Sequence, residues 1–188
     1  SVTMKQTSTV KLADEPTRIK FSNSGKHCFV AFLNNSIRMY HSDTFRETVA
    51  FYGHSLPVSD FDVSTDDYVL ASVSLDKSIR VWDKDFGNCR RIINKAHENG
   101  GLRLKIVKDT HYAITTGKDG LVKQWDLDTF ELVSVIESVF GLEVRVLSLS
   151  KEGDFFVAGG SGGVLRRFNQ GKEQVFAVEA KEKLEEEN

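Results

Sequence analysis

Short runs of alternating apolar and polar residues, separated by turn residues, recur along most of the chain. In the clearest stretch the runs cover residues 58–64, 68–74, 78–82 and 88–94. Alternation with a period of two and many β-branched residues is typical of short strands. Turn pairs such as Asp66-Asp67 and Asp76-Lys77 stand between the runs. The pattern therefore predicts an all-β fold with four short strands in each unit.

The unit recurs with a period of 43 residues. Trp82 and Trp125 are each followed by Asp, and they lie 43 residues apart. The same separation relates three further pairs, His54 and His97, Ser72 and Thr115, and Asp76 and Asp119. Four residue types in one register resemble the WD-repeat family, whose repeats each form a four-stranded blade of a β-propeller. Because a lone blade cannot bury both of its faces, we expect neighbouring blades to stack around an axis.

About four such units fit into the chain. We predict a WD-repeat β-propeller over residues 1–178, as part of a seven-bladed propeller, followed by a short acidic helix over residues 179–188. The units are expected at about residues 13–53, 54–96, 97–139 and 140–178. The strand near Val2 to Val10 is expected to be the outer strand of a preceding blade. Since the chain begins with Ser1 rather than Met, we expect it to be an excised piece of a longer protein.

The first and last units lose polar landmarks. In the first unit the Ser, Asp and Trp positions are occupied by Val30, Asn34 and Tyr40. In the last unit the His, Ser, Asp and Trp positions are occupied by Phe140, Ala158, Gly162 and Phe168. Both units keep the apolar alternation, so we expect them to keep their strands without the hydrogen-bonded network.

Each complete set of landmarks can form a closed hydrogen-bond network. The carboxylate would accept from the imidazole, whose other nitrogen meets a hydroxyl that in turn accepts from the indole. Because buried polar groups are costly unless paired, such networks rigidify a core. The predicted structural tetrads are His54, Ser72, Asp76 and Trp82, and His97, Thr115, Asp119 and Trp125. A His–Ser–Asp trio also resembles a catalytic triad, but its recurrence beside a Trp favours a structural role.

The composition narrows the possible functions. Of 188 residues, 40% are apolar and 28% are charged, which is ordinary for a globular protein. The net charge of −2 gives no global sign of nucleic-acid or membrane binding. Cys28 and Cys89 form no CxxC motif, which fits a reducing compartment and argues against a disulfide or zinc framework. We expect no enzyme activity, no catalytic residue, and no cofactor, metal, small-molecule substrate or membrane partner.

One face is the expected site of protein contact. Partners commonly bind propellers on the face that carries the loops before the first strand and between the second and third strands. The repeat register places on this face Leu33, Pro57, Ser59, Leu75, Leu102, Lys118, Glu143, Arg145 and Ser161. The three leucines are expected to be exposed apolar anchors, with Lys118, Glu143 and Arg145 as a polar rim.

A basic column offers an alternative contact with RNA. One strand of each unit contributes a cation at the same register, which gives Arg38, Arg80, Lys123 and Arg166. Such a column could follow a phosphate backbone, although it is more often a solvated strand face. Protein contact is favoured because the net charge is near zero and no aromatic stacking platform accompanies the column.

Several strings are more specific than the generic repeat. In chain order they are Phe51–Val58, Asp85–Cys89, Asp109–Tyr112, Gly117–Asp126, Phe130–Leu132 and Glu173–Phe176. Together they resemble the Dip2 family, the tandem-propeller WD-repeat subunit of the UTP-B complex. The resemblance covers nearly the whole chain and points to the last part of the second propeller. The sequence departs from the family in its final blade, where Phe140 and Phe168 replace His and Trp-like landmarks.

The resemblance implies a non-catalytic scaffold in small-subunit ribosome biogenesis. It implies a nucleolar location, other UTP-B and small-subunit processome proteins as partners, and contact with U-three snoRNA or pre-rRNA within the particle. The alternative is an unrelated WD-repeat adaptor, such as a cullin-ligase substrate receptor. Those receptors often carry Arg two residues after the Trp-Asp pair. Asp85 and Asp128 stand there in this chain, which counts against that alternative.

Overall fold

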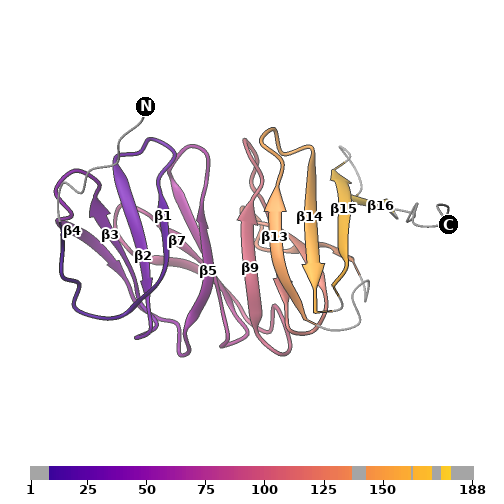
Figure 1. The fold of residues 1–188 in the computed structure, drawn as a ribbon, viewed down its shortest axis with the longest axis horizontal. Helices are drawn as coiled ribbons and strands as arrows, with labels where there is room; N and C mark the ends of the chain where they lie inside the picture. Colours follow the sequence, from indigo (N-terminus) through magenta and orange to yellow (C-terminus); the bar gives the residue numbers. More distant parts are fainter. Residues whose placement is uncertain (1–8, 137–142, 162, 171–174, 179–188) are drawn as a thin grey trace, which may run out of the picture.

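Four antiparallel sheets of four strands make up the described part of the computed structural model, which covers residues 9–136, 143–161, 163–170 and 175–178. The sheets lie side by side, and the chain passes through them in order (Figure 1). This arrangement confirms the prediction of an all-β propeller segment with about four blades. The predicted helix over residues 179–188 lies outside the described residues, as does most of the strand expected near Val2 to Val10.

The strands fall close to the predicted runs. The first sheet holds β1 (Pro16–Phe21), β2 (His27–Phe32), β3 (Ile37–His41) and β4 (Glu47–Phe51). The second holds β5 (Val58–Val63), β6 (Val69–Ser74), β7 (Ile79–Asp83) and β8 (Cys89–Ile93). The third holds β9 (Gly101–Ile106), β10 (Tyr112–Gly117), β11 (Val122–Asp126) and β12 (Leu132–Ile136). The fourth holds β13 (Val144–Leu149), β14 (Phe155–Gly160), β15 (Leu165–Gln170) and β16 (Val175–Val178).

Apolar side chains fill the space between successive sheets. Phe29, Phe51, Phe61 and Trp82 belong to a buried cluster that joins the first two sheets. Two further clusters join the second sheet to the third and the third to the fourth. The two middle blades thus pack both faces against neighbours, and the two outer blades pack one, as the alternation of apolar residues requires. In the described residues, no helix is long and apolar enough to span a membrane.

The turn between the second and third strands has a positive φ at the same register position in every blade. The residues concerned are Asn35 (69°), Lys77 (72°), Gly120 (77°) and Gly163 (73°). Glycine and asparagine adopt this left-handed conformation readily, whereas Lys77 adopts it at a cost. The degenerate first and last blades therefore keep this positive φ of the complete ones.

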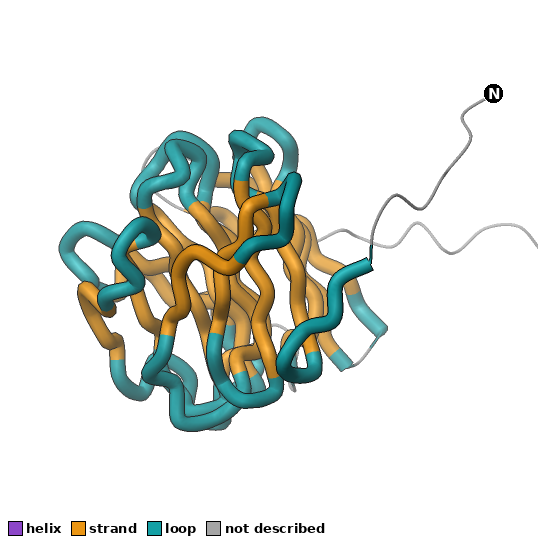
Figure 2. Tube along the Cα trace, turned by 90° about the vertical axis from the view of Figure 1, so that its left-hand side faces the viewer, coloured by secondary structure: helices purple, strands orange, loops and turns teal. Residues whose placement is uncertain are grey.

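The first strand of every blade forms an edge of its sheet, and these edges are neighbours. β1, β5, β9 and β13 follow one another across the molecule, and β9 contacts both β5 and β13 (Figure 1). In a propeller this row of inner strands surrounds the axis. The loops collect at the two ends of the sheets (Figure 2). One end carries the loops predicted to contact partners.

Candidate interaction site: the hydrogen-bonded tetrads and the loop face

The second blade brings its four landmark residues together. His54 Nδ1 lies 2.7 Å from Asp76 Oδ2, and His54 Nε2 lies 2.8 Å from Ser72 Oγ. The indole Nε1 of Trp82 donates to Ser72 Oγ over 2.8 Å. Asp76 Oδ2 also accepts from the backbone N–H of Ser55 at 3.1 Å. The network ties the loop before β5 to the centre of the blade.

The third blade repeats this geometry. His97 Nδ1 lies 2.9 Å from Asp119 Oδ1, and His97 Nε2 lies 2.9 Å from Thr115 Oγ1. The indole of Trp125 donates to Thr115 Oγ1 over 2.8 Å. Closed networks with every polar atom paired hold a blade in one arrangement. The loops at this end of the blades are consequently presented by a rigid support.

The two carboxyls of these networks ionise more readily than usual. Burial opposes ionisation of Asp76, but hydrogen bonds from His54 and Ser78 outweigh it and lower the pKa of Asp76 below its ordinary value. Burial likewise opposes ionisation of Asp119, and the bond and charge of His97 lower its pKa in the same direction. Both carboxylates are therefore charged at neutral pH and act as fixed acceptors.

The His–Ser–Asp trio has no geometry for nucleophilic catalysis. Ser72 is 0% exposed, and its hydroxyl is held by both His54 and Trp82. A nucleophile must reach the substrate and must be free to attack it. Since the hydroxyl is sealed inside the blade, the trio serves the fold.

The acid dependence of stability should report on these networks. Because folding lowers the pKa of Asp76 and Asp119, their stabilisation is fully present above the unfolded pKa of about 4 and is lost as pH falls through the folded value. Chemical denaturation of the intact protein should show a free energy of unfolding that declines between about pH 5 and pH 2. Asp119→Asn should flatten this decline, whereas Asp128→Asn, an exposed control, should leave it unchanged. Equal slopes in the parent and Asp119→Asn proteins would contradict the assignment.

The first blade replaces the network by apolar packing. Cys28, Val30, Phe32 and Tyr40 form a buried cluster, and Leu12 packs against it at the position that aligns with the missing His. Replacing a whole polar network by apolar groups of similar shape costs little, whereas removing one partner costs much. The blade is therefore degenerate in sequence but complete in packing.

In the first blade, Asn34 keeps the turn-capping hydrogen bonds that Asp76 makes in the second. Asn34 Oδ1 accepts from the backbone N–H of Ser36 at 3.1 Å and from its hydroxyl at 2.6 Å. Asp76 Oδ1 makes the same two bonds with Ser78, at 2.9 and 2.6 Å. The side chain at this position thus caps the turn in both blades, which accounts for the amide in place of the acid.

The predicted partner residues lie at one end of the blades, in equivalent loops. A single backbone bond joins the two loops in every blade: Leu33 N–H to Glu15, Leu75 to Pro57, Lys118 to Gly100 and Ser161 to Glu143, over 3.0 to 3.3 Å. Ser59, Leu102 and Arg145 follow these loops within the inner strands. The structure therefore brings the nine residues to one face.

The expected exposure of the three leucines is correct for one of them. Leu33 is 48% exposed, whereas Leu75 and Leu102 are half-buried. The loop of the next blade covers Leu75, because a Cβ added to Gly100 would lie only 3.1 Å from the Leu75 Cα. The prediction that Leu75 and Leu102 are exposed apolar anchors is therefore wrong.

Two exposed apolar residues of the same face escaped the sequence reasoning. Tyr52 is 64% exposed and Leu56 is 48% exposed, and both lie in the loop that leads into β5. The signal was available, since both belong to the specific string Phe51–Val58. Neither residue recurs at the repeat period, so their exposure has no counterpart in the neighbouring units.

The basic column is not the exposed strand face that was expected. Lys123 is only 11% exposed, and its Nζ donates to the Ala96 carbonyl over 2.5 Å. Arg38 pairs with Glu47 at 3.0 Å, and Arg80 lies against Gly53 with its guanidinium 5.8 Å from the Trp82 ring. Arg166 is half-buried on β15. Cations held within and between blades are poorly placed to follow a phosphate backbone, which argues against this column as an RNA site.

One group of side chains has metal-ligand chemistry. His111, Asp126 and Asp128 have ligand atoms within 4.8 Å of one another on the surface of the third blade. His111 Nε2 lies 3.4 Å from Asp126 Oδ2, and its Nδ1 lies 3.8 Å from Asp128 Oδ2. The Asp126 carboxylate already accepts from the backbone N–H groups of Asp128 and Thr129. These bonds stabilise the turn after β11, and the three side chains are explained by this turn and a nearby histidine without a metal ion.

These features define the class of protein: the chain is a WD-repeat β-propeller segment with two complete tetrads. Residues 1–175 match the family model described as the WDR3 second beta-propeller domain. The chain therefore belongs to the WDR3 second β-propeller family.

Relatives and solved structures agree with the fold. The nuclear distribution protein nudF of Aspergillus niger is 34% identical over 112 residues, which is 57% of this chain and 25% of that protein. Transducin beta-like protein 3 of Rattus norvegicus is 27% identical over 107 residues, or 52% of this chain and 13% of that protein. The chain thus spans a quarter or less of the length of these relatives.

The structures of U3-55K and of the RRP9 WD40 repeats superpose on the chain with a TM-score of 0.79. Each is 22% identical to this chain and covers 89% of it, while the chain covers 53% and 52% of the two structures, respectively. At this identity the likeness establishes the propeller fold, in which the chain accounts for about half of the matched structure.

Proposed function

We propose that the chain belongs to a non-catalytic scaffold subunit of small-subunit ribosome biogenesis, acting in the UTP-B complex of the small-subunit processome in the nucleolus. The observation that carries the proposal is the match of residues 1–175 to the WDR3 second propeller. The order of specific strings from Phe51 to Phe176, which resembles the Dip2 family, supports it. In this role the chain positions other proteins during U-three snoRNA-dependent pre-rRNA processing.

The geometry supports scaffolding over chemistry. The tetrads of the second and third blades are internally paired, so they stiffen the blades and leave no free nucleophile. The face above them carries exposed Leu33, Tyr52 and Leu56 among polar loops. Apolar and aromatic anchors within a polar rim are typical of protein-binding surfaces. Other UTP-B or processome proteins are the partners proposed for this face.

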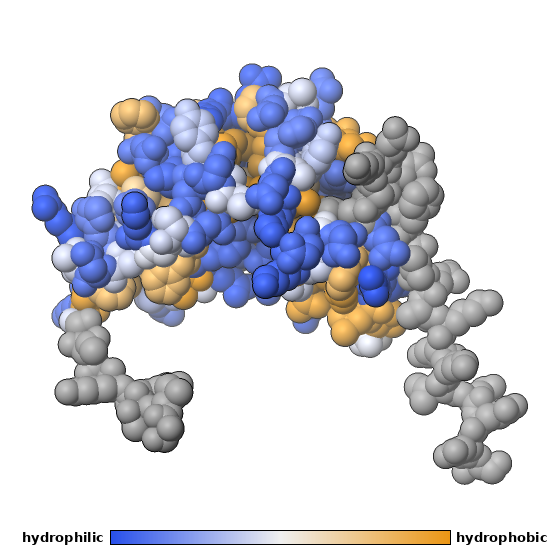
Figure 3. Space-filling model, turned by 90° about the horizontal axis from the view of Figure 1, so that it is seen from above, coloured by the Kyte–Doolittle hydropathy of each residue, from blue (hydrophilic) through white to orange (hydrophobic). Residues whose placement is uncertain are grey.

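In the described residues, the opposite end of the blades has no single dominant apolar surface. Figure 3 shows this end from above, and on it hydrophilic residues predominate and the apolar residues form separate patches. The loops that lead into the inner strands lie at the other end, because β9 and β13 run upward in Figure 1. We therefore place the protein contact on the loop face, where Leu33, Tyr52 and Leu56 are exposed.

Affinity purification of the full-length protein tests the assignment. We expect the other UTP-B subunits and U-three snoRNA to co-purify, and we expect depletion of the protein to block maturation of the small-subunit rRNA. Co-purification of a cullin and its adaptor, without processome subunits, would instead establish the alternative of a ligase substrate receptor.

The loop face should be required for the protein contact. Leu33→Asp combined with Leu56→Asp should reduce co-purification of the direct partner at least about tenfold, because buried apolar anchors carry most interface energy. The loss should depend little on salt, unlike contacts with RNA. Leu132→Asp on β12, which is similarly exposed, is the matched control and should retain the partner. Equal loss in the control would remove the loop face as the explanation.

A further inference from the structure

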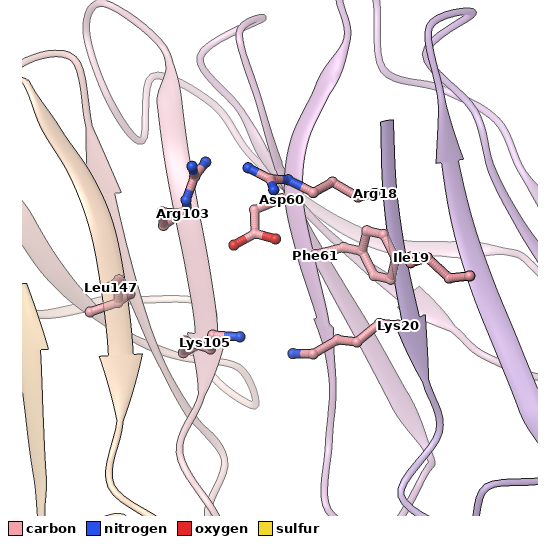
Figure 4. Close-up of a pocket in the computed structure, with 8 residues that line it drawn as sticks. All are labelled: Arg18, Ile19, Lys20, Asp60, Phe61, Arg103, Lys105 and Leu147. Atoms are coloured by element: carbon pink, nitrogen blue, oxygen red, sulfur yellow. The ribbon is translucent and has the colours of Figure 1, made fainter. Parts of the chain in front are cut away.

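A pocket of about 240 Å³ lies between the inner strands of successive blades. Its walls come from β1, β5 and β9, with one residue from β13, and the lining side chains are labelled in Figure 4. Ile19, Phe61 and Leu147 supply the apolar part of the lining. The rest of the lining is charged, and cations outnumber carboxylates.

The cations converge in two like-charged pairs. Arg18 of β1 and Arg103 of β9 point toward one another across Asp60, which lies between their strands (Figure 4). Lys20 and Lys105, from the same two strands, also direct their ammonium groups toward one another (Figure 4). Like charges placed together repel unless an anion lies between them.

The carboxylates near the pocket are already engaged. Asp60 Oδ2 accepts from the edge N–H of Leu104 at 3.2 Å, and Asp62 Oδ2 accepts from the edge N–H of Ile106 at 3.0 Å. Asp62 also pairs with Lys20. The two carboxylates thus join β5 to the free edge of β9, and they neutralise only half of the four cations.

The environment makes this charge excess costly. Burial lowers the pKa of Arg103, and the charge of Arg18 adds to the effect. Burial also lowers the pKa of Lys20, against the attraction of Asp62 and with repulsion from Lys105. Both shifts have the direction that burial among other cations gives to a positive group, and the nearby carboxylates do not cancel them. A bound anion would relieve both.

We propose that this pocket binds the phosphate group of a small molecule between the Arg18–Arg103 and Lys20–Lys105 pairs. The four cations and two carboxylates leave an excess of two positive charges. A phosphate monoester carries about −1.5 to −2 at pH 7, which matches that excess. A single guanidinium can donate two parallel N–H bonds to two phosphate oxygens, and two guanidinium groups converge here.

A small molecule fits better than a nucleic acid strand. Contact with a strand needs a row of cations, and the candidates for such a row, Arg38 and Lys123, are held by Glu47 and by the Ala96 carbonyl. The pocket cations lie instead in one confined place between inner strands. The proposal is independent of the role in ribosome biogenesis, since it rests only on the lining of this pocket.

Isothermal titration of the full-length protein at constant ionic strength tests the proposal. The probes are inorganic phosphate, pyrophosphate and the monoester glycerol phosphate, with chloride as the reference salt. Arg103→Gln and Lys105→Gln should each weaken binding about tenfold, since each removes a charge-assisted hydrogen bond. Arg46→Gln and Lys26→Gln, on exposed cations outside the pocket, are the matched controls and should bind as the parent does. Preference for glycerol phosphate over inorganic phosphate, which carries a similar charge, would identify an organic phosphate as the ligand, and equal binding would identify free phosphate.

Asp60→Asn gives a test in the opposite direction. The amide keeps an oxygen to accept from Leu104 N–H but removes one negative charge from the pocket, so phosphate binding should become about tenfold tighter. The proposal is overturned if none of the three probes binds, if the control variants lose binding as much as the pocket variants, or if Asp60→Asn weakens it. Pocket-dependent binding of single-stranded RNA, without binding of any probe, would overturn it in favour of a polymer.

Discussion

Replacing Asp119 by alanine should lower the free energy of unfolding by about 2–4 kcal/mol. Its carboxylate accepts from His97 Nδ1 at 2.9 Å and from the backbone N–H groups of Glu98 and Leu121, both at 3.2 Å. His97 is fully buried, so water cannot replace the lost acceptor. The cost follows because the substitution leaves the buried His97 donor without a partner while the rest of the network stays in place.

Chemical denaturation of the intact protein measures this effect. Asp128→Ala is the matched control, because the Asp128 side chain is 77% exposed and lies one turn away in the same blade. We expect that control to change stability by less than about 0.5 kcal/mol. A neutral Asp119→Ala variant would refute the view that the tetrads stabilise the blades.

Gly101→Ala should be the second most disruptive of the substitutions considered, with a loss of about 1–3 kcal/mol. A Cβ at this position would lie 1.9 Å from Cγ2 of Val73, which is buried in the core between the second and third blades. Val73 is β-branched and confined by its neighbours, so it cannot turn away. At the equivalent place between the first two blades, the large and small residues are exchanged: Val58 lies in the same cluster as Ala31.

A double-mutant cycle tests this size complementarity. Val73→Ala alone should destabilise by leaving a cavity, and Gly101→Ala alone should destabilise by overpacking. Combined, the two changes should cost less than the sum of the single effects, by about 1 kcal/mol or more. Additive effects would contradict the contact between these two positions as the cause.

The positions of the strands and tetrads could be read from the sequence because their signals are local or periodic. Alternation of apolar residues located β5 to β8 within a residue or two of their observed bounds. The spacing of His54, Asp76 and Trp82 predicted that their side chains lie close together, since residues at equal offsets in a repeat occupy equivalent positions in every blade. The same periodicity favoured a structural role for the trio over a catalytic one.

Properties that depend on contacts between blades could not be read in this way. The exposure of Leu75 was misjudged because the loop at Gly100 of the next blade covers it. The exposure of the basic column was misjudged because the Lys123 side chain lies between two blades and donates a hydrogen bond to the Ala96 carbonyl. In both cases the contacting residue is more than 20 residues away in the sequence. The repeat register predicts where each residue lies in its blade, but it does not predict the direction in which the side chain points.

By itself, the sequence determined that this chain forms stacked four-stranded blades, which residues make the tetrads, and which loops share a face. Repetition is sufficient for those conclusions, because identical spacing in each unit imposes identical local geometry. Only the tertiary structure decided how the blades differ. It showed the apolar replacement of the first tetrad around Leu12 and the convergence of Arg18 with Arg103 beside Asp60. These features arise between side chains from different blades, where packing and charge depend on the particular neighbours that the fold brings together.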